Sequence, residues 1–556
     1  MNDFRNKQFG KNKPSRNSID GFRQPRPGAN RTPLANGPNH RQIGDFSARG
    51  GLTPANQNRT VQAPALQPKP SFADEPLLIA KKTSKIGRRG FLGIGRRDAT
   101  GKKVKMSRRR RVTLTVVAIL TLLLLTVGFL AFKGYININK VLKGGGGAAA
   151  LESNVDPSKL RGEGDGRVNI LLLGRGGEGH EAPDLTDTVI VASIDPIAKE
   201  ASLVSLPRDL YVPVGGGNGS MKLNAVYVTG KNAALAKTSR QKQTDEIKKQ
   251  ADEAGFSLLE QTIEKNLGVP IHYREIIDFT GFKQAVDTVG GVTVNVPSSV
   301  TENMRIDGKN YKLDVKPGVQ QMDGFKALAY TRSRHTSARG DFDRSERQRS
   351  IIIALKAKVL SAGTFSNPAK ISGLLDTLGD RVQTNFTIQD LTRIYQLGNE
   401  IDQSKITSIG LSDPPNNFVT TDNIGGQSVV VPRSGVGNFN EIKGYLRNQL
   451  KDSFIRDENA SIAVLNGTSK SGLATQKADE LKSFGYNITA VDNAPTRSYT
   501  KTTIVDLRGG AKKYTKNYLE KRFDVNVTST LPDATIVPGT ADFVIILGSD
   551  QSEAQR

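Results

Sequence analysis

Beyond residue 166 the apolar residues form short runs separated by turn-forming residues, which is typical of a chain that alternates strands and helices. Apolar or alternating runs predict strands at residues 168–173, 188–193, 201–206, 273–279 and 292–296. Helical periodicity predicts helices at 255–267 and 282–289, and the lysine-rich segment 230–254 is typical of an exposed insertion with helical character. This mixture predicts an α/β fold, with an α/β/α layered domain over residues 167–450.

A second, smaller unit is predicted at residues 460–550. Its strands are expected at 461–465, 487–491, 503–507, 525–528 and 543–547, and its helices at 473–483 and 513–523. This order favours a small C-terminal α/β sandwich domain. Residues 451–459 are then the linker between the two folded units.

Residues 112–132 carry no charge over 21 positions, which is long enough to span the hydrocarbon core of a bilayer. A buried core helix is the alternative, but Arg108–Arg111 directly precede the run and no cleavage motif follows it. Residues 92–111 hold nine Lys or Arg and residues 133–152 hold three, so the N-terminus is expected in the cytoplasm. The pattern predicts a single-pass signal anchor in a cell membrane, with everything after residue 133 extracytoplasmic.

The segment 133–166 then becomes an extracytoplasmic linker. Its glycine and alanine run at residues 144–150 predicts a short flexible spacer.

The net charge of +25 is unevenly distributed. Residues 1–111 contain 26 Lys or Arg and 6 Asp or Glu, so about +20 comes from this tail and only about +5 from the rest. The tail is poor in apolar residues and is predicted to be a disordered basic cytoplasmic tail attracted to anionic membrane lipid, with nucleic acid an unlikely partner. The chain has no Cys, which excludes disulfides and thiolate metal sites.

The segment 330–349 contains six arginines and no lysine, and an apolar run follows it directly. Arg332 and Arg334 are two residues apart, which would place them on one face of a strand. Arg344, Arg347 and Gln348 have the spacing of one helix face. Guanidinium groups converging from two elements would form a phosphate site, whereas a solvated basic face with internal ion pairs is the alternative.

The glycines of Gly174–Gly179 match G-x-G-x-x-G, but the next strand begins too soon for the crossover helix that a dinucleotide site requires. Asp184 and Asp187 follow in the same loop and would either bind Mg²⁺ through oxygen or cap a turn. Arg208 and Asp209 follow the strand predicted at 201–206. They would form a plain salt bridge, or bring a phosphate-binding group and a general base to one site.

These segments together resemble the LytR-CpsA-Psr family of cell-wall glycopolymer transferases. The resemblance rests on L-L-L-G, D-T, S-L-P-R-D, K-L-N-A, D-F-T-G-F, V-D-T-V-G-G-V and the arginine segment, in that order, at residues 171–174, 187–188, 205–209, 222–225, 278–282, 286–292 and 330–349. The unit at 460–550 resembles the C-terminal domain that often accompanies the family, through V-L-N-G-T and I-L-G-S-D.

The resemblance implies a membrane-anchored phosphotransferase of bacterial cell wall assembly. It would move a glycopolymer phosphate from a polyprenyl-pyrophosphate-linked glycan to a peptidoglycan hydroxyl. A pyrophosphatase acting on the same lipid, or a non-catalytic wall-binding or regulatory protein, are the alternatives. The expected catalytic residues are Arg208, Asp209, Asp187 and Arg344, and the expected substrate-binding residues are Lys222, Arg332, Arg334, Asp341, Arg347 and Gln348.

Mg²⁺ is expected on Asp187 and Asp184. The chain departs from the family at Gly176, where an acidic residue is usual, and at Leu185, where an arginine is usual. An apolar tunnel for the lipid is expected between the sheet and its helices, with candidate lining residues Ile276, Ile277, Phe279, Phe282, Ile351, Ile352 and Leu355.

Overall fold

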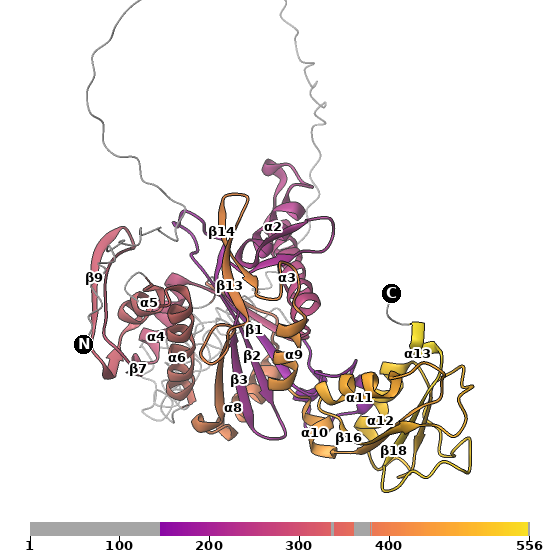
Figure 1. Ribbon diagram of the computed structural model, residues 1–556. Helices are drawn as coiled ribbons and strands as arrows, with labels where there is room; N and C mark the ends of the chain where they lie inside the picture. The colour runs from indigo at the N-terminus through magenta and orange to yellow at the C-terminus, as the bar shows by residue number, and fades with distance from the viewer. Residues whose placement is uncertain (1–144, 335–337, 361–378, 380, 554–556) are drawn as a thin grey trace, which may run out of the picture. The chain divides into compact units, whose positions relative to one another are not determined.

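The computed structural model describes residues 145–334, 338–360, 379 and 381–553 (Figure 1). The predicted basic tail and the predicted transmembrane helix at 112–132 lie outside the described residues. Within the described ranges, no helix is both long and apolar enough to cross a membrane.

The centre of the first domain is a mixed six-stranded sheet in the order β11-β6-β1-β2-β3-β12. Strands β1, β2 and β3 form an antiparallel meander, because the loops that join them are too short for a crossover helix. Strand β6 runs parallel to β1, β12 runs parallel to β3, and β11 is antiparallel to β6. The strands are β1 (Val168–Arg175), β2 (Thr186–Asp195), β3 (Glu200–Ser205), β6 (Tyr273–Asp278), β11 (Val382–Thr384) and β12 (Ile406–Gly410).

Each face of this sheet buries alternate residues of the same strands, as the two-residue period of a strand requires. On one face Leu171, Val189 and Val204 pack with α2 (Leu223–Leu235), α3 (Asp245–Leu267) and α9 (Asn440–Gln449). On the other face Ile170, Ile190 and Leu203 pack with residues of α6 (Asp341–Leu360) and α8 (Ile388–Glu400). Figure 1 shows α3 and α9 on one side of the sheet and α6 on the other. The predicted α/β/α layering is therefore confirmed.

A third hydrophobic cluster includes Ile351, Ala354 and Leu355 in the C-terminal half of α6. It joins helices α4 and α5 to two hairpin-like pairs, β7 with β10 and β8 with β9. These elements are α4 (Phe279–Thr288), β7 (Val292–Val296), β8 (Val300–Ile306), β9 (Lys309–Val315), β10 (Gly318–Met322) and α5 (Gly324–Arg332). Two further pairs complete the domain: β4 (Tyr211–Pro213) with β5 (Ser220–Lys222), and β13 (Val419–Ile424) with β14 (Gln427–Pro432).

The C-terminal domain has a four-stranded sheet in the order β16-β15-β18-β17. Strand β15 is parallel to both neighbours, and β17 is antiparallel to β18. Its elements are β15 (Ser461–Asn466), α11 (Leu473–Ser483), β16 (Asn487–Asn493), β17 (Thr503–Asp506), α12 (Lys513–Phe523), β18 (Phe543–Leu547) and α13 (Asp550–Glu553). The strand predicted at 525–528 is wrong, since only Thr528 forms an isolated bridge with Val505.

Two segments that composition predicts as connections are ordered in the structure. The expected spacer at residues 144–150 leads into a short 3₁₀ helix, Ala149–Leu151, in which Ala150 and Leu151 are buried in the core. The predicted linker at 451–459 contains helix α10 (Ser453–Glu458), and Asp452 at its N-cap is buried. In both places tertiary contacts order a segment whose composition alone is typical of a connection.

The strand expected around Arg332 and Arg334 is also wrong. Arg332 is the last residue of helix α5, which Asp323 caps by accepting a hydrogen bond from the Lys326 backbone. The candidate tunnel residues do not line one space either. Phe279, Phe282, Ile351 and Leu355 share the third cluster, whereas Ile276 and Ile352 belong to the clusters on opposite faces of the sheet.

Helices α2 and α3 approach closely through two glycines. A Cβ added at Gly255 would lie 2.6 Å from the backbone oxygen of Tyr227, and one at Gly230 would lie 2.9 Å from that of Ala254. We therefore expect Gly255→Ala to lower the free energy of unfolding by about 1–3 kcal/mol despite the higher helix propensity of alanine. The matched control is Gly444→Ala in α9, where an added Cβ meets nothing within 4 Å and should stabilise by about 0.5–1 kcal/mol. Chemical denaturation compares the two variants, and equal effects would contradict the close-packing explanation.

Candidate anion-binding site

In the meander of the central sheet, the start of β2 and the end of β3 lie at the same end of neighbouring strands. Ile190 pairs with Ser205, so Asp187 before it and Arg208 after β3 lie close together at that end of the sheet. The first turn of α6, with Asp341 and Arg344, and the end of α5, with Arg332, complete the surroundings. Segments more than a hundred residues apart in sequence thus meet here, as the resemblance implied.

Arg208 forms the centre of the charge network. Its Nη1 lies 2.8 Å from Asp187 Oδ1, and its Nε lies 3.3 Å from Asp209 Oδ2 and 3.9 Å from Asp341 Oδ1. Lys222 Nζ lies 2.9 Å from the other oxygen of Asp209. Burial alone would lower the pKa of Arg208, but the three carboxylates together raise it above its ordinary value. Arg208 is therefore a fixed cation whose plane is set by its acidic neighbours.

Arg344 is the most buried arginine of this network, with 6% of its surface exposed. Its Nη2 lies 2.7 Å from Asp341 Oδ1 and donates to the backbone oxygen of Asp187 at 3.5 Å. Burial lowers the pKa of Arg344 to about 10, although Asp341 opposes the shift. An anion placed beside this guanidinium would recover the solvation that burial removes.

Arg332 approaches the same network from the end of α5. Its guanidinium carbon lies 4.8 Å from the ring centroid of Phe279, a cation–π contact that holds its plane. Burial lowers the pKa of Arg332, and the charge of Asp187 opposes that shift. Arg332 therefore lies close enough to Asp187 to interact with it electrostatically.

Three buried guanidinium nitrogens of this cluster have no hydrogen-bond partner among the described residues. They are Nε of Arg208, Nη1 of Arg332 and Nε of Arg344. Buried donors are nearly always satisfied in folded proteins, so unsatisfied donors on cations are suited to an anionic ligand. We call Arg208, Arg332 and Arg344, with Asp187 and Asp341, the arginine cluster.

Arg347 and Gln348 lie behind the arginine cluster rather than in it. Arg347 donates from Nε to the Tyr330 carbonyl at 3.1 Å and from Nη2 to the Ser333 carbonyl, and Gln348 donates to the Thr331 carbonyl at 3.5 Å. These carbonyls end helix α5, where cations are favourable. The periodicity correctly placed both side chains on one face of α6, but in the structure they hold the end of α5.

A hydrogen bond from its backbone to Glu302 holds Arg334 near the arginine cluster. Buried Glu302 accepts from the Ser333 hydroxyl at 2.7 Å and from the Arg334 backbone at 2.8 Å. Burial is the largest cause that lowers the pKa of Arg332 and of Arg344. The charge of Arg334 lowers both pKa values further. Glu302 was not predicted as a site residue, because a single glutamate on an edge hairpin gives no signal in sequence.

The acidic residues do not fit the predicted magnesium site. Asp184 is held by two cations, with Arg175 Nη1 at 2.9 Å from Oδ1 and Lys231 Nζ at 2.9 Å from Oδ2. Asp187 is held by Arg208, and the part of the chain that the structure describes contains no group of three or more His, Asp or Glu able to hold a metal. The positive charge at this edge of the sheet comes from Arg and Lys side chains, so no reaction step below is routed through a metal.

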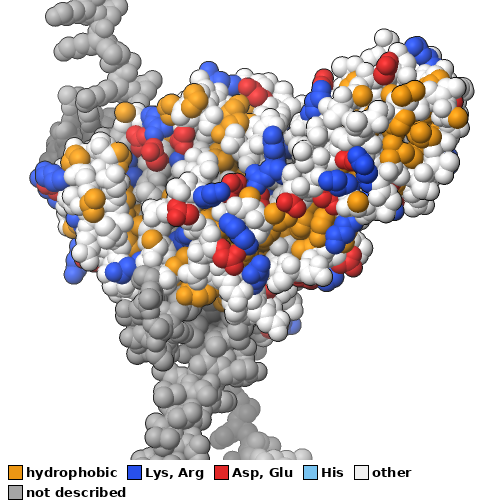
Figure 2. All heavy atoms as spheres, turned by 90° about the horizontal axis from the view of Figure 1, so that it is seen from below, with side chains coloured by type: hydrophobic (Ala, Val, Ile, Leu, Met, Phe, Trp, Pro, Cys, Tyr) orange, Lys and Arg blue, Asp and Glu red, His pale blue; other side chains and the backbone are white. Residues whose placement is uncertain are grey.

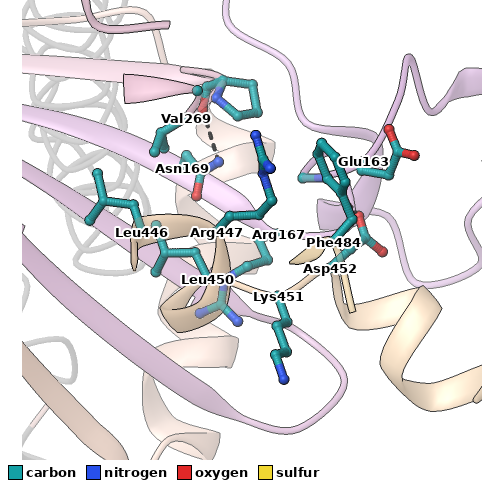
Figure 3. A pocket seen from close by; sticks show the side chains of 13 residues that line it. Glu163, Arg167, Asn169, Val269, Leu446, Arg447, Leu450, Lys451, Asp452 and Phe484 are labelled. Atoms are coloured by element: carbon teal, nitrogen blue, oxygen red, sulfur yellow. Dashed lines mark hydrogen bonds between the residues drawn. The ribbon is translucent and has the colours of Figure 1, made fainter. Parts of the chain in front are cut away.

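The cavity shown in Figure 3 lies elsewhere and contains none of the arginine cluster. It has a volume of about 40 Å³ and is lined by Arg167, Asn169, Arg447, Asp452 and Phe484 among others. Asn169 Nδ2 donates to the Pro270 carbonyl there at 2.8 Å. On the face shown in Figure 2, basic and acidic side chains are interspersed across the middle of the molecule, so this face has no single-sign charge.

Comparison with known proteins adds to this geometry. Residues 135–433, more than half of the chain, match the LytR_cpsA_psr family. The chain belongs to the LytR-CpsA-Psr family. Residues 459–550 match the domain described as LytR cell envelope-related transcriptional attenuator.

Relatives within the LytR-CpsA-Psr family carry names from cell wall assembly. Cell wall biosynthesis protein LcpA of Corynebacterium glutamicum is 28% identical over 70% of this chain and 78% of its own. The polyisoprenyl-teichoic acid–peptidoglycan teichoic acid transferases TagU of Enterococcus faecalis and TagV of Bacillus subtilis are each 32% identical. Those two matches cover 41% and 42% of this chain and 64% and 54% of the relatives. The crystal structure of B. subtilis TagV aligns with 51% of this chain and 97% of its own, at 26% identity and a TM-score of 0.38.

Proposed function

We propose that this protein transfers a glycopolymer phosphate from a polyprenyl-pyrophosphate carrier to a hydroxyl of peptidoglycan. The observation that carries the proposal is the arginine cluster, in which Arg208, Arg332 and Arg344 converge and three buried guanidinium nitrogens lack hydrogen-bond partners among the described residues. A pyrophosphate concentrates negative charge over two neighbouring phosphorus atoms, and planar guanidinium groups suit its oxygens. The names of TagU and TagV support the same class of donor and acceptor.

The proposed reaction exchanges a phosphoanhydride bond for a phosphate ester bond. The acceptor hydroxyl oxygen forms a bond to the phosphorus that carries the glycan, and the bridging P–O bond to the second phosphorus breaks. The electron pair of that bond stays with the lipid phosphate, which leaves as a monophosphate, and the hydroxyl proton passes to a base. The charge that moves onto the leaving oxygen would be stabilised by the fixed cations of the cluster.

The acidic residues in and beside the cluster would act mainly by orienting these cations. Asp187, Asp209 and Asp341 each contact Arg208, and Asp341 also contacts Arg344. Holding the guanidinium planes in advance lowers the reorganisation that charge transfer needs. Lys222 contributes through Asp209, whereas Arg347 and Gln348 would support the end of α5 that carries Arg332.

We further propose that the segment 112–132 anchors the chain in the membrane, with the catalytic domain outside the cell. A donor whose lipid tail stays in the bilayer would then reach the arginine cluster without leaving the membrane surface. The basic tail at 1–111 would lie at the cytoplasmic face, attracted to anionic lipid. Accessibility of single introduced cysteines at residue 20 and at the exposed residue 153 to a membrane-impermeant reagent tests this topology, since the natural chain has no Cys.

The reaction is tested with the full chain in detergent, a short-chain polyprenyl-pyrophosphate-linked oligosaccharide and a soluble peptidoglycan fragment. Mass spectrometry follows two products, the lipid monophosphate and the glycan joined to peptidoglycan by a phosphodiester. The assay is run with Mg²⁺ and with a chelator, because the predicted metal is not part of the proposed step. The control donor is the same glycan on a lipid monophosphate, which has no pyrophosphate bond to break.

Formation of both products from the pyrophosphate donor alone is the expected result. Lipid monophosphate without the phosphodiester would identify a pyrophosphatase instead. Binding of the donor with neither product would favour the non-catalytic wall-binding role and overturn the proposal.

A further inference from the structure

One described histidine shares an aromatic neighbour with the arginine cluster and lies in the loop between β1 and β2. His180 belongs to the loop that carries Asp184, and its ring centroid lies 5.0 Å from that of Phe279 in an edge-to-face contact. Phe279 also supports the Arg332 guanidinium, so one aromatic ring contacts both groups. Sequence reasoning did not single out this residue, although the chain has only four histidines.

Close packing fixes the position of the His180 side chain. A Cβ added at Gly176 would lie 2.9 Å from His180 Cβ and 3.1 Å from its Cγ, so the imidazole lies directly on the Gly176 backbone. The His180 backbone donates to the Gly177 carbonyl at 3.2 Å, and Gly177 in turn donates to that of Pro183 at 3.0 Å. The glycines of this loop thus allow a side chain to lie over the end of β1, where a larger residue at 176 would exclude it.

The His180 ring forms no hydrogen bond with any residue that the structure describes, and it is only partly buried. Of the two histidines that the structure describes, His272 has the hydrogen-bonded ring, and its two nitrogens contact the Asn169 backbone and Asp165. His180 therefore keeps both ring nitrogens available to a ligand.

The carboxylates beside the arginine cluster are less available to accept a proton. Asp187 Oδ1 already accepts from Arg208, and the two oxygens of Asp209 face Arg208 and Lys222. Protonation of either would break an ion pair that orients Arg208. An imidazole has no such bond to lose, and it is the side chain best suited to move protons near neutral pH.

We propose that His180 is the general base of the transfer reaction proposed above, on which this inference rests. A ring nitrogen of His180 accepts the proton of the acceptor hydroxyl as that oxygen bonds to the glycan-bearing phosphorus. The bridging P–O bond breaks with its electron pair on the lipid phosphate. The imidazolium then returns its proton to solvent, and its charge meanwhile lies beside a phosphate that is losing its leaving group.

Charged groups around His180 come from three elements. Its own loop contributes Glu178, Glu181 and Asp184, the last of which is held by Arg175 and Lys231. The start of α4 contributes Asp278, which lies against Gly177 and is held by Arg381 at 3.4 Å. The end of α5 contributes Arg332 across the Phe279 ring.

The test measures transfer by the full chain over a range of pH, for the wild type and His180→Gln. The wild type should lose activity at acid pH as the base becomes protonated. His180→Gln should be slower by about 10²-fold at neutral pH and should lack the acid limb. Its dissociation constant for a non-transferable lipid pyrophosphate should stay within about threefold of the wild-type value, because the base contributes to the step rather than to binding.

A control and a rescue separate this outcome from misfolding. Glu181→Gln changes an exposed charge on the same loop and should keep the wild-type profile. His180→Gly should regain part of its rate when free imidazole is added. An acid limb that persists in His180→Gln, or lost donor binding with an unchanged limb, would overturn the role of His180. Absence of transfer by the wild type would instead sink the proposed function itself.

Discussion

Arg344→Ala should reduce the rate of lipid monophosphate release by about 10³-fold, the scale found when a fixed cation is removed from a phosphoryl-transfer site. Arg344 is buried, points toward Asp187 and Asp341, and has an Nε donor without a partner in the described chain. Its removal would leave Asp341 without its closest counter-ion and would remove a donor from the pyrophosphate. Most of the loss should appear in kcat, because developing charge on the leaving oxygen is greatest in the transition state.

Two further variants test whether the loss depends on the guanidinium group and on its place in the arginine cluster. Arg344→Lys keeps the charge but not the planar fork, so a loss of about 10²-fold is expected. Arg433→Ala removes an exposed arginine that donates to Asn417 and lies outside the arginine cluster, and it should keep the wild-type rate. The thermal unfolding midpoint is measured for each protein. Near wild-type transfer by a folded Arg344→Ala variant would show that the arginine cluster is not the reaction site.

The spacing of residues predicted which side chains share an element but not what each one contacts. Arg344 and Arg347 lie on one face of α6, as expected from three-residue spacing. Yet Arg344 faces Asp187, whereas Arg347 reaches the carbonyls at the end of α5, because the neighbours of a helix change along its length. That difference depends on the packing of α5 against α6, which no local pattern contains.

Local composition was misleading where tertiary contacts provide the order. The glycine and alanine run before residue 151 predicted a flexible spacer, but the Gly146 and Gly147 backbones donate to the carbonyls of Asn385 and His272. The two-residue spacing of Arg332 and Arg334 predicted a strand, but Asp323 caps a helix that extends to Arg332. Strands β1, β2 and β3 were predictable because their apolar residues are buried on both faces of the sheet.

The ion pairs of the predicted magnesium ligands could not be foreseen from local pattern either. Sequence identified Asp184 and Asp187 as oxygen ligands close to a strand, but it gave no sign of the cations that hold them. Arg175 comes from the end of β1 and Lys231 from α2, and the fold brings both to Asp184. A candidate ligand is therefore defined as much by its ion pairs as by its own chemistry.

Asp452 is expected to be the most sensitive stabilising residue outside the site. It lies in the segment predicted as a linker, is 2% exposed, and connects three parts of the chain. Its Oδ2 accepts from the backbones of Gly164 and Gly166 at 3.0 and 2.8 Å and from the Tyr518 hydroxyl at 3.0 Å. Its Oδ1 accepts from the first turn of α10, at the backbones of residues 454 and 455.

Asp452→Asn should therefore lower the free energy of unfolding by about 3–5 kcal/mol, because the amide nitrogen of an asparagine of the same size would turn a donor toward backbone and hydroxyl donors at a buried site. Differential scanning calorimetry of the full chain should show an unfolding midpoint lower by about 10 °C for the transition that includes the C-terminal domain. Asp457→Asn on the exposed side of α10 is the matched control and should move the midpoint little. An Asp452→Asn protein as stable as the wild type would mean that α10 and the segment around Gly164 are held together by apolar packing alone.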